Sequence, residues 1–221
     1  MLILIVPYRA RHQPERLFQL SLFIQTLLHH IPSAYIYIIE QADDRPFNRG
    51  ALLNIGVHIA TMSKEDIICF HDVDLLPCAD IVAEYLIQLP TKTVRHIGRA
   101  WKHYDTDRYL GGILMMRKSD FLSINGYPND FFGGGGEDDE IRDRIQRAGI
   151  NIERNMYGTI IDQEQLTQRE KLSYLQTTHQ QCIENKWHQQ HSGQVGFRQV
   201  EYNILKVNRY AHNCVHYVTA F

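Results

Sequence analysis

Cysteine is scarce in this sequence, with only four in 221 residues. The four positions, Cys69, Cys78, Cys182 and Cys214, show none of the short paired spacings that zinc sites use. They lie largely in apolar stretches, as structural thiols do in a reducing compartment. We therefore expect neither a zinc site nor a disulfide framework.

Long apolar runs and runs of like charge are missing as well. The apolar start MLILIV gives way to Pro7, Tyr8 and Arg9, so it is too short for a signal-peptide core or a membrane span. The net charge is −2 with histidine neutral, and charges of both signs are mixed along the chain. We expect a soluble protein with no membrane span and no nucleic-acid partner.

The sequence does contain enough apolar material for one large domain, with 44% hydrophobic residues. In the first half, short β-branched runs at 2–8, 34–41 and 66–74 alternate with segments of helical periodicity at 14–30 and 49–62. This alternation predicts an α/β sheet with crossover helices, whose strands end at an edge where ligands bind.

The second half gives different signals. Residues 113–126 predict a strand followed by a short helix, and 196–210 with 214–221 predict a terminal pair of strands. Between them, the run GGGG leads into a helix that begins with EDDE and ends near Gly149. No internal repeat and no long linker divides the chain.

The stretch FHDVDLLP places two carboxylates, Asp72 and Asp74, directly after a buried apolar run. Burying an unpaired carboxylate is costly, so the pair needs a cation, strong donors or water. Alternate residues of an extended chain point to one side, so both aspartates can offer oxygens to one hard cation. A turn in which one aspartate caps a helix explains the motif equally well. Both interpretations stay open on this motif alone.

Three further patterns favour a ligand site. PYRARHQ puts Arg9 and Arg11 at the end of the first strand, where they can meet phosphates. RPFNRGALLNIG puts Phe47 and Arg49 at the start of a helix, an aromatic face beside a forked cation. The glycine run before EDDE suits close backbone approach or a mobile lid better than a rigid loop. Four adjacent carboxylates also repel one another unless some face a cation or take up protons.

Five segments carry these patterns in order: VPYRAR, FNRGALLNIG, FHDVDLLP, YLGGILMMRKSDFLSINGYPNDF and GGGGEDDEIRDRI. In this order and approximate spacing they resemble the β-1,4-galactosyltransferase family, and the resemblance covers residues 2–149 well. HDVDLLP together with EDDE is most similar to the branch that galactosylates xylose.

The resemblance implies a GT-A fold, a Rossmann-like nucleotide-sugar transferase fold with a single mixed sheet flanked by helices. It implies an inverting transfer of galactose from UDP-galactose to a saccharide hydroxyl, with manganese as the divalent metal, in polysaccharide or glycoconjugate synthesis. The chain is then one domain over residues 1–221, with a nucleotide-binding half at 1–110 and an acceptor and catalytic half at 111–221.

On this resemblance, the donor site falls on four segments. The residues that would line the uridine and diphosphate are Pro7, Tyr8, Arg9, Arg11, Phe47 and Arg49. Asp72 and Val73 would lie along the nucleotide sugar, with Asp74 as the metal ligand. The residues that would contact the donor sugar are Tyr109, Gly111 and Gly112.

The acceptor site falls on the acidic run. The resemblance implies that Glu137, Asp138 and Asp139 bind the acceptor, that Glu137 and Asp138 are catalytic, and that Asp138 is the base. The chemistry agrees, because an acceptor hydroxyl is a weak acid and needs a carboxylate to take its proton. At the other end of the displacement, a divalent ion neutralises the leaving diphosphate.

Two departures from the family pattern concern the acceptor and the metal. Gly134 stands where the family has a tryptophan that stacks on the acceptor. The segment YGTIIDQEQLTQ has no histidine where the family supplies a metal ligand, so Asp162 or Glu164 are the candidate oxygen ligands in its place. We therefore expect the free protein to bind manganese weakly and UDP to complete the shell of the metal.

Alternatives to this function stay open. The departures suit a catalytically silent relative that binds nucleotide or glycan, and a transferase that uses UDP-N-acetylgalactosamine or UDP-glucose is a further alternative. Tyr109 favours galactose, because a bulky residue there resembles the family's galactose pocket. Membrane-bound members of the family carry an anchor that this sequence does not show, so we expect a cytoplasmic protein that acts on a soluble or lipid-linked saccharide.

Overall fold

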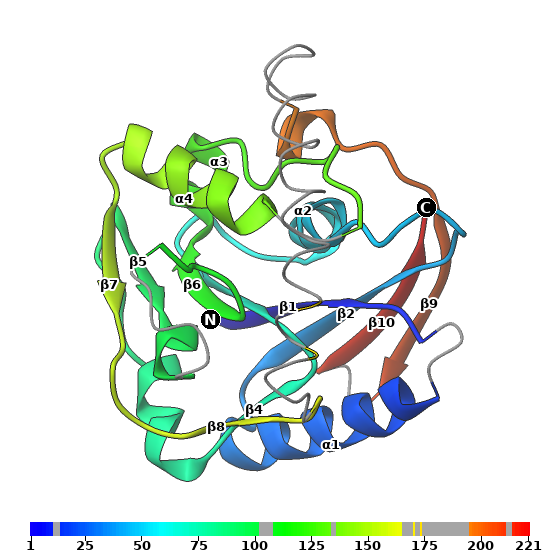
Figure 1. Ribbon diagram of the computed structural model, residues 1–221, viewed down its shortest axis with the longest axis horizontal. Coiled ribbons are helices and arrows are strands. Elements are labelled where there is room, and N and C mark those ends of the chain that lie inside the picture. Colours follow the sequence, from blue (N-terminus) through cyan, green and yellow to red (C-terminus); the bar gives the residue numbers. More distant parts are fainter. Residues whose placement is uncertain are drawn as a thin grey trace.

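The computed structural model describes residues 1–10, 14–101, 108–133, 136–164, 170, 173, 195–210 and 214–221. The strands of its main sheet are β1 (Leu2–Tyr8), β2 (Tyr35–Gln41), β3 (Ile67–His71), β5 (Thr93–His96), β6 (Ile113–Arg117), β7 (Asn151–Arg154), β9 (Ile204–Tyr210) and β10 (Val215–Ala220). They lie in the order β7-β5-β6-β3-β1-β2-β10-β9 (Figure 1). Two short strands, β4 (Leu75–Pro77) and β8 (Ile160–Asp162), form a separate ladder.

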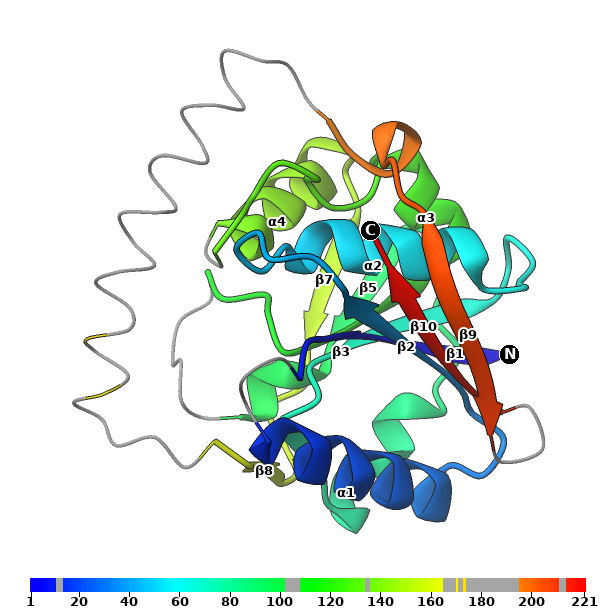
Figure 2. The same ribbon diagram turned by 90° about the vertical axis from the view of Figure 1, so that its right-hand side faces the viewer.

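Helices cover both faces of the sheet. The α-helices are α1 (Glu15–His30), α2 (Arg49–Ile59), α3 (Lys118–Ser123) and α4 (Glu137–Arg147), and the 3-10 helices are η1 (Ala79–Tyr85), η2 (Ile97–Ala100) and η3 (Phe197–Gln199). Figures 1 and 2 show α2, α3 and α4 on one face and α1 on the other. Strands β6 and β9 run antiparallel to their neighbours, whereas β1, β2, β3 and β10 are parallel. This confirms the predicted α/β architecture, a mixed sheet flanked by helices.

The N-terminal elements form because each buried strand is followed by a helix with one apolar face. Strand β1 pairs in parallel with β2 on one side and β3 on the other. Helix α1 connects β1 to β2, and α2 connects β2 back across β1 to β3. Right-handed crossovers in opposite directions place their helices on opposite faces, so α1 and α2 cover different sides. The periodicity predicted all five of these elements.

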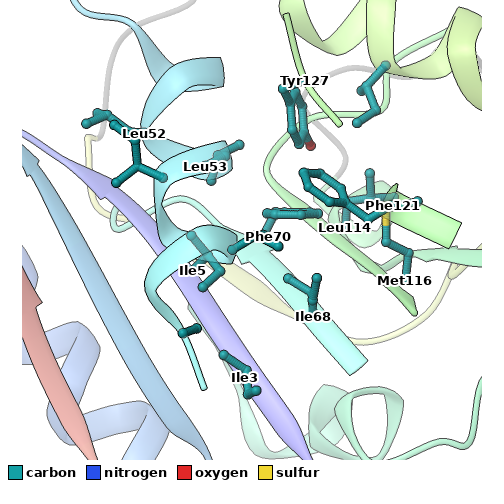
Figure 3. Packing of buried hydrophobic residues seen from close by; sticks show 14 of the residues in the cluster. Ile3, Ile5, Leu52, Leu53, Ile68, Phe70, Leu114, Met116, Phe121 and Tyr127 are labelled. Atoms are coloured by element: carbon teal, nitrogen blue, oxygen red, sulfur yellow. The ribbon is translucent and has the colours of Figure 1, made fainter. Parts of the chain in front are cut away.

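Each face of the sheet has its own hydrophobic core. On the α2 side, Ile5, Leu53, Phe70, Phe121 and Tyr127 are buried together (Figure 3). The ring of Phe70 lies 5.1 Å from that of Phe121 and 5.2 Å, edge-on, from that of Tyr127, measured between centroids. A second cluster fills the α1 side. Because aromatic burial contributes strongly to stability, these contacts fix β3, whose C-terminal end leads into the aspartates.

The C-terminal ends of the parallel strands meet the start of β6 at one edge of the sheet. His71 at the end of β3 pairs with Ile113, the first residue of β6. The next residues outward are therefore neighbours, and the amide of Asp72 donates to the carbonyl of Gly112 at 2.9 Å. The β4–β8 ladder brings the chain after residue 160 to the same region. Segments distant in sequence thus converge where ligands bind in α/β sheets.

Two expectations about local structure were wrong. Strand β3 ends at His71, so Asp72 and Asp74 lie beyond it. The amide of Leu75 donates to the carbonyl of Asp72 at 3.3 Å, which closes a turn, so the two carboxylates do not share one face of an extended chain. Helix α2 also ends at Ile59, before the predicted boundary at residue 62, because the next residue has an extended backbone.

Candidate active site

Arg49, the first residue of α2, joins the two acidic motifs. Its Nε donates to Asp72 Oδ1 at 2.8 Å, and its Nη1 donates to Asp138 Oδ1 at 2.8 Å. Glu137 Oε1 lies 3.8 Å from the same Nη1, and only 10% of the arginine side chain is exposed. Burial disfavours the charge, but the carboxylates of Asp138 and Asp72 hold the pKa of Arg49 well above its usual value. One enclosed cation therefore connects the motifs that the sequence predicted to form a site.

Close packing fixes the start of α2. The side chain of Asn48 caps the helix, and its Nδ2 donates to the carbonyl of Asn129 at 2.5 Å. Gly50 permits this approach, because a Cβ there would lie 2.2 Å from the carbonyl oxygen of Pro128. The helix thus begins against the loop that precedes α4, and this position directs Arg49 toward the carboxylates of α4.

Helix α4 carries the predicted base in its first turn. Gly136 precedes the helix with φ 92°, a left-handed conformation that favours glycine. Burial raises the pKa of Asp138 to about 7, repulsion from Glu137 and Asp72 adds to the shift, and Arg49 opposes it. Both protonation states of Asp138 are therefore accessible near neutral pH, which is the property that a general base requires.

The second oxygen of Asp138 faces Gly111. A Cβ on Gly111 would lie 2.2 Å from Asp138 Oδ2 and 2.7 Å from Tyr109 Cε2, so only glycine allows these side chains to pack this closely against the backbone. Gly112 has φ 77°, and a Cβ there would lie 3.1 Å from the Tyr109 hydroxyl. The ring of His96 donates through Nε2 to the carbonyl of Gly111 at 2.9 Å. Of the three predicted donor-sugar residues, Gly111 therefore lies against the predicted base, and Tyr109 lies against both glycines.

Asp74, the predicted metal ligand, contacts an arginine of α1. Arg16 Nη1 lies 3.5 Å from Asp74 Oδ2, and Arg16 Nη2 donates to Glu164 Oε1 at 2.5 Å. Burial raises the pKa of Asp74 to about 7, repulsion from Asp72 and Glu164 adds to the shift, and Arg16 opposes it. Of the two oxygen ligands that the sequence offered, Asp162 and Glu164, the structure shows Glu164 sharing a cation with Asp74.

The predicted uridine and diphosphate residues lie at the end of β1 and before α2. The guanidinium of Arg9 lies 5.3 Å from the centroid of the Phe47 ring. Pro7 and Tyr8 are buried, and the Tyr8 hydroxyl has no hydrogen-bond partner in the part of the chain that the structure describes. Arg11 lies outside the described residues. The structure thus pairs a ring face with a cation, a combination that suits a nucleotide.

Three predicted positions remain. Val73 is buried, and its carbonyl accepts from Gln163 Nε2 at 2.9 Å. Asp139 forms an ion pair with Arg142 of the same helix at 2.6 Å. Gly134, the position of the missing tryptophan, lies outside the described residues. The roles of Val73 and Asp139 in binding stay predictions.

A buried polar chain supports the backbone of Asp72. His71 Nδ1 donates to the carbonyl of Asp72 at 2.9 Å, and the Tyr85 hydroxyl donates to His71 Nε2 at 2.9 Å. These directions follow because a carbonyl only accepts, which fixes the tautomer. Burial lowers the pKa of His71 to about 4, so the ring stays neutral at physiological pH. His71 therefore holds the turn of the acidic motif in place.

Sequence reasoning missed Arg16 and Tyr127. Arg16 gave no signal, because its partners Asp74 and Glu164 are distant along the chain and only the fold brings them together. Tyr127 lies in a segment that carried the family resemblance, so a signal was present. The guanidinium of Arg49 lies 5.8 Å from the centroid of the Tyr127 ring.

Within the described ranges, no three histidine, cysteine, aspartate or glutamate residues gather closely enough to hold a metal ion. Asp74 and Glu164 are nevertheless hard oxygen donors, the type that divalent cations such as Mg²⁺ and Mn²⁺ prefer, and they fit a site that a phosphorylated ligand completes. Among the same described residues, no helix is both long and apolar enough to cross a membrane.

Comparison with solved structures places the fold. The chain matches Drosophila β-1,4-galactosyltransferase 7 in complex with xylobiose, with 26% identity and a TM-score of 0.71, over 100% of this chain and 93% of that one. A mannosyltransferase from Pyrobaculum calidifontis matches with a TM-score of 0.60 and 13% identity, over 88% of this chain and 65% of that one, which shows the fold alone.

Comparison of sequences gives the family. Human β-1,4-galactosyltransferase 3 is 38% identical over 157 residues, which are 68% of this chain and 39% of the human protein. Mouse β-1,4-galactosyltransferase 1 is 38% identical over 158 residues, which are 68% of this chain and 38% of the mouse protein. The chain thus spans about two fifths of the length of these curated relatives.

Two family models match consecutive parts of the chain. The N-terminal region of glycosyl transferase group 7 matches residues 1–85, and the N-terminal domain of galactosyltransferase matches residues 93–167. The matched residues include Arg49, Asp72, Asp74 and Asp138, which the structure gathers at one edge of the sheet. The chain therefore belongs to the β-1,4-galactosyltransferase family, group 7 of the glycosyltransferases, and has a GT-A fold.

Proposed function

We propose that this chain is an inverting glycosyltransferase that moves galactose from UDP-galactose to a hydroxyl of a saccharide. The observation that carries the proposal is the position of Arg49, which donates to Asp72 and to Asp138 at 2.8 Å each. It joins the motif expected at the donor to the motif expected at the acceptor. A related solved structure, of a Drosophila β-1,4-galactosyltransferase 7 variant, holds manganese, UDP-galactose and xylobiose.

Asp138 is the base in this proposal. Its Oδ1 accepts from Arg49, so the oxygen that takes the acceptor proton is Oδ2, which lies against Gly111. Tyr109 also lies against Gly111, so in this proposal the acceptor hydroxyl and the donor sugar meet beside Asp138 and Tyr109. Arg49 keeps the carboxylate from rotating, which preserves the orientation that proton transfer needs. Glu137, near the same guanidinium, binds sugar hydroxyls.

The donor is held along the edge of the sheet. Arg9 and Phe47 offer a cation and a ring to the nucleotide, and the turn at Asp72 lies beside the sugar. Asp74 and Glu164, the two carboxylates that share Arg16, would hold a manganese ion there. When bound, that ion neutralises the negative charge that develops on the leaving UDP.

The proposal also covers the acceptor, the place where the protein acts and the roles of the two halves of the chain. The combination of HDVDLLP and EDDE makes a xylose-terminated saccharide the first acceptor to test, since a related structure holds xylobiose. We propose that the protein acts in the cytoplasm on a soluble or lipid-linked saccharide, in polysaccharide or glycoconjugate synthesis. Residues 1–110 mainly bind the nucleotide, and residues 111–221 mainly serve the acceptor and the chemistry.

The test is turnover of a panel of UDP-sugars with manganese. UDP release is measured with UDP-galactose, UDP-N-acetylgalactosamine and UDP-glucose, each with a xyloside, with an N-acetylglucosaminide and without acceptor. We expect the fastest turnover with UDP-galactose and an acceptor. Preference for another sugar would refute the donor assignment. Tight UDP binding with no turnover of any donor would indicate the alternative, a silent relative that binds nucleotide.

A further inference from the structure

Arg16 occupies the place between the two carboxylates that face the diphosphate end of the proposed site. Its Nη1 lies 3.5 Å from Asp74 Oδ2, and its Nη2 donates to Glu164 Oε1 at 2.5 Å. Nη1 also donates to Gln19 Oε1 at 3.1 Å. The exposed fractions of the Arg16, Asp74 and Glu164 side chains are 23%, 19% and 32%, so this ion pair is largely enclosed. Enclosure makes it stronger than an ordinary surface pair.

The backbone places Glu164 independently of Arg16. The amide of Gln163 donates to the carbonyl of Asp74 at 2.8 Å, and its side chain donates to the carbonyl of Val73 at 2.9 Å. These bonds continue the β4–β8 ladder, and Figures 1 and 2 show β8 beside α1. Two carboxylates on fixed backbone segments therefore approach one another, and a cation between them relieves their repulsion.

A guanidinium and a divalent ion compete for such a pair. Both draw on the carboxylates of Asp74 and Glu164, and their like charges exclude simultaneous occupation at close range. Arg16 is held by α1 and is present at all times, whereas the metal arrives from solution. Metal binding must therefore break the contacts of Arg16 before it forms its own.

We propose that Arg16 is a built-in competitor of the divalent cation, which neutralises Asp74 and Glu164 in the free protein and is displaced when metal and nucleotide bind together. This inference rests on the proposed function, in which a metal and a diphosphate share this edge. The diphosphate makes this displacement favourable, because its oxygens offer the displaced guanidinium new hydrogen-bond acceptors. Metal is then held firmly only with the nucleotide present.

The test is calorimetric titration of manganese into the full chain, with and without UDP. Arg16→Gln removes the cation, so we expect manganese to bind the UDP-free variant roughly 10-fold or more tightly than the wild type, within the usual range of coupling between sites. The factor by which UDP tightens manganese binding should shrink correspondingly. Arg16→Lys keeps the charge without the forked contact, so we expect a smaller gain in affinity and a fold that stays intact.

Arg95 offers a matched control. It also bridges two carboxylates, donating to Glu84 at 2.8 Å and to Glu153 at 3.1 Å, and 21% of its side chain is exposed. Arg95→Gln changes the net charge by the same amount, so it controls for the effect of the net charge of the protein on manganese binding. We expect it to leave manganese affinity unchanged. Melting temperatures of all variants report whether they fold.

The outcomes separate this inference from the function on which it rests. A wild type that binds no manganese even with UDP would overturn the metal-dependent function. A wild type that binds manganese with UDP, while folded Arg16→Gln and Arg16→Lys bind it no more tightly than Arg95→Gln, would overturn the role of Arg16 alone. Loss of UDP binding in Arg16→Gln without any gain for manganese would instead make Arg16 a permanent partner of the diphosphate and refute competition.

Discussion

The two oxygens of Asp138 have different neighbours, and the difference predicts the result of a conservative substitution. In Asp138→Asn an oxygen remains to accept from Arg49, but no carboxylate takes the acceptor proton. We expect transfer to fall by roughly 100-fold or more, the scale of losing a general base, while UDP binding stays nearly unchanged. Turnover and calorimetric UDP affinity measure the two effects.

Asp143 provides the control on the same helix. Its carboxylate pairs with Arg142 at 2.9 Å and is 42% exposed, so Asp143→Asn should leave turnover unchanged. If Asp138→Asn turns over nearly as fast as this control, Asp138 is not the base.

Tyr109 determines how much room the donor sugar has. Its ring and hydroxyl lie against Gly111 and Gly112, so a smaller side chain opens that space. We expect Tyr109→Leu to raise the use of UDP-N-acetylgalactosamine relative to UDP-galactose, measured as the ratio of kcat/KM values. Tyr109→Phe keeps the ring and should keep most of the preference. An unchanged ratio in Tyr109→Leu would remove the reason for assigning galactose.

At the level of elements, the connection into β6 shows why a methyl group can disable the site. A Cβ on Gly111 would lie 2.2 Å from Asp138 Oδ2, so Gly111→Ala must push the base or Tyr109 away. We expect at least a 10-fold loss of kcat, roughly the cost of a misplaced reacting group, with the fold retained. Turnover and the melting temperature distinguish these effects.

Gly149, at the end of α4, is the comparison. Its φ is 65° and a Cβ there meets nothing within 4 Å, so Gly149→Ala strains only the local backbone. It should lower stability slightly and leave kcat unchanged. Equal kcat in the two alanine variants would show that the close contact between Gly111 and Asp138 is not needed for the reaction.

The elements also show what a sequence can and cannot predict. β1 and β2 are short apolar runs rich in isoleucine, and α1 has a clear apolar face, so local pattern was sufficient. β4 and β8 are three residues each and exist only because they pair with each other. The contact of Arg16 with Asp74 depends on that tertiary arrangement, so local sequence pattern cannot predict it.

For the whole molecule, ionisation of the base should reduce stability as the pH rises from acidic to neutral. The pKa of Asp138 is raised from 3.8 to about 7 in the folded protein by burial, so between these values the folded state binds more protons than the unfolded state. The free energy of unfolding therefore falls as the pH rises through this window. Asp138→Asn removes the effect, so its melting temperature relative to the wild type should increase from pH 4 to pH 8.

Thermal unfolding of the wild type and of Asp138→Asn across this pH range measures the difference in melting temperature. Asp143→Asn, exposed and paired, should show a difference from the wild type that hardly depends on pH. If the Asp138 variant loses stability relative to the wild type as the pH rises, the carboxylate is stabilised by its site and the raised pKa is wrong.

At this scale the family resemblance predicted more than local pattern did. The order of motifs along the chain placed Arg49, Asp72 and Asp138 in one site, and the structure joins them. The resemblance was poor beyond residue 149, so the ladder that brings Glu164 to Asp74 became visible only in the fold. A departure from the family pattern can thus be interpreted only when the elements that pack around it are known.

The position of β10 has a consequence for synthesis of the protein in the cell. Strand β10 pairs with β2, although residues 215–220 are translated long after residues 36–41. Until β10 emerges from the ribosome, one side of β2 exposes backbone groups that can pair with strands of other chains. The nascent chain therefore carries an open sheet edge through most of its translation, and chaperones that bind extended segments would protect it during that interval.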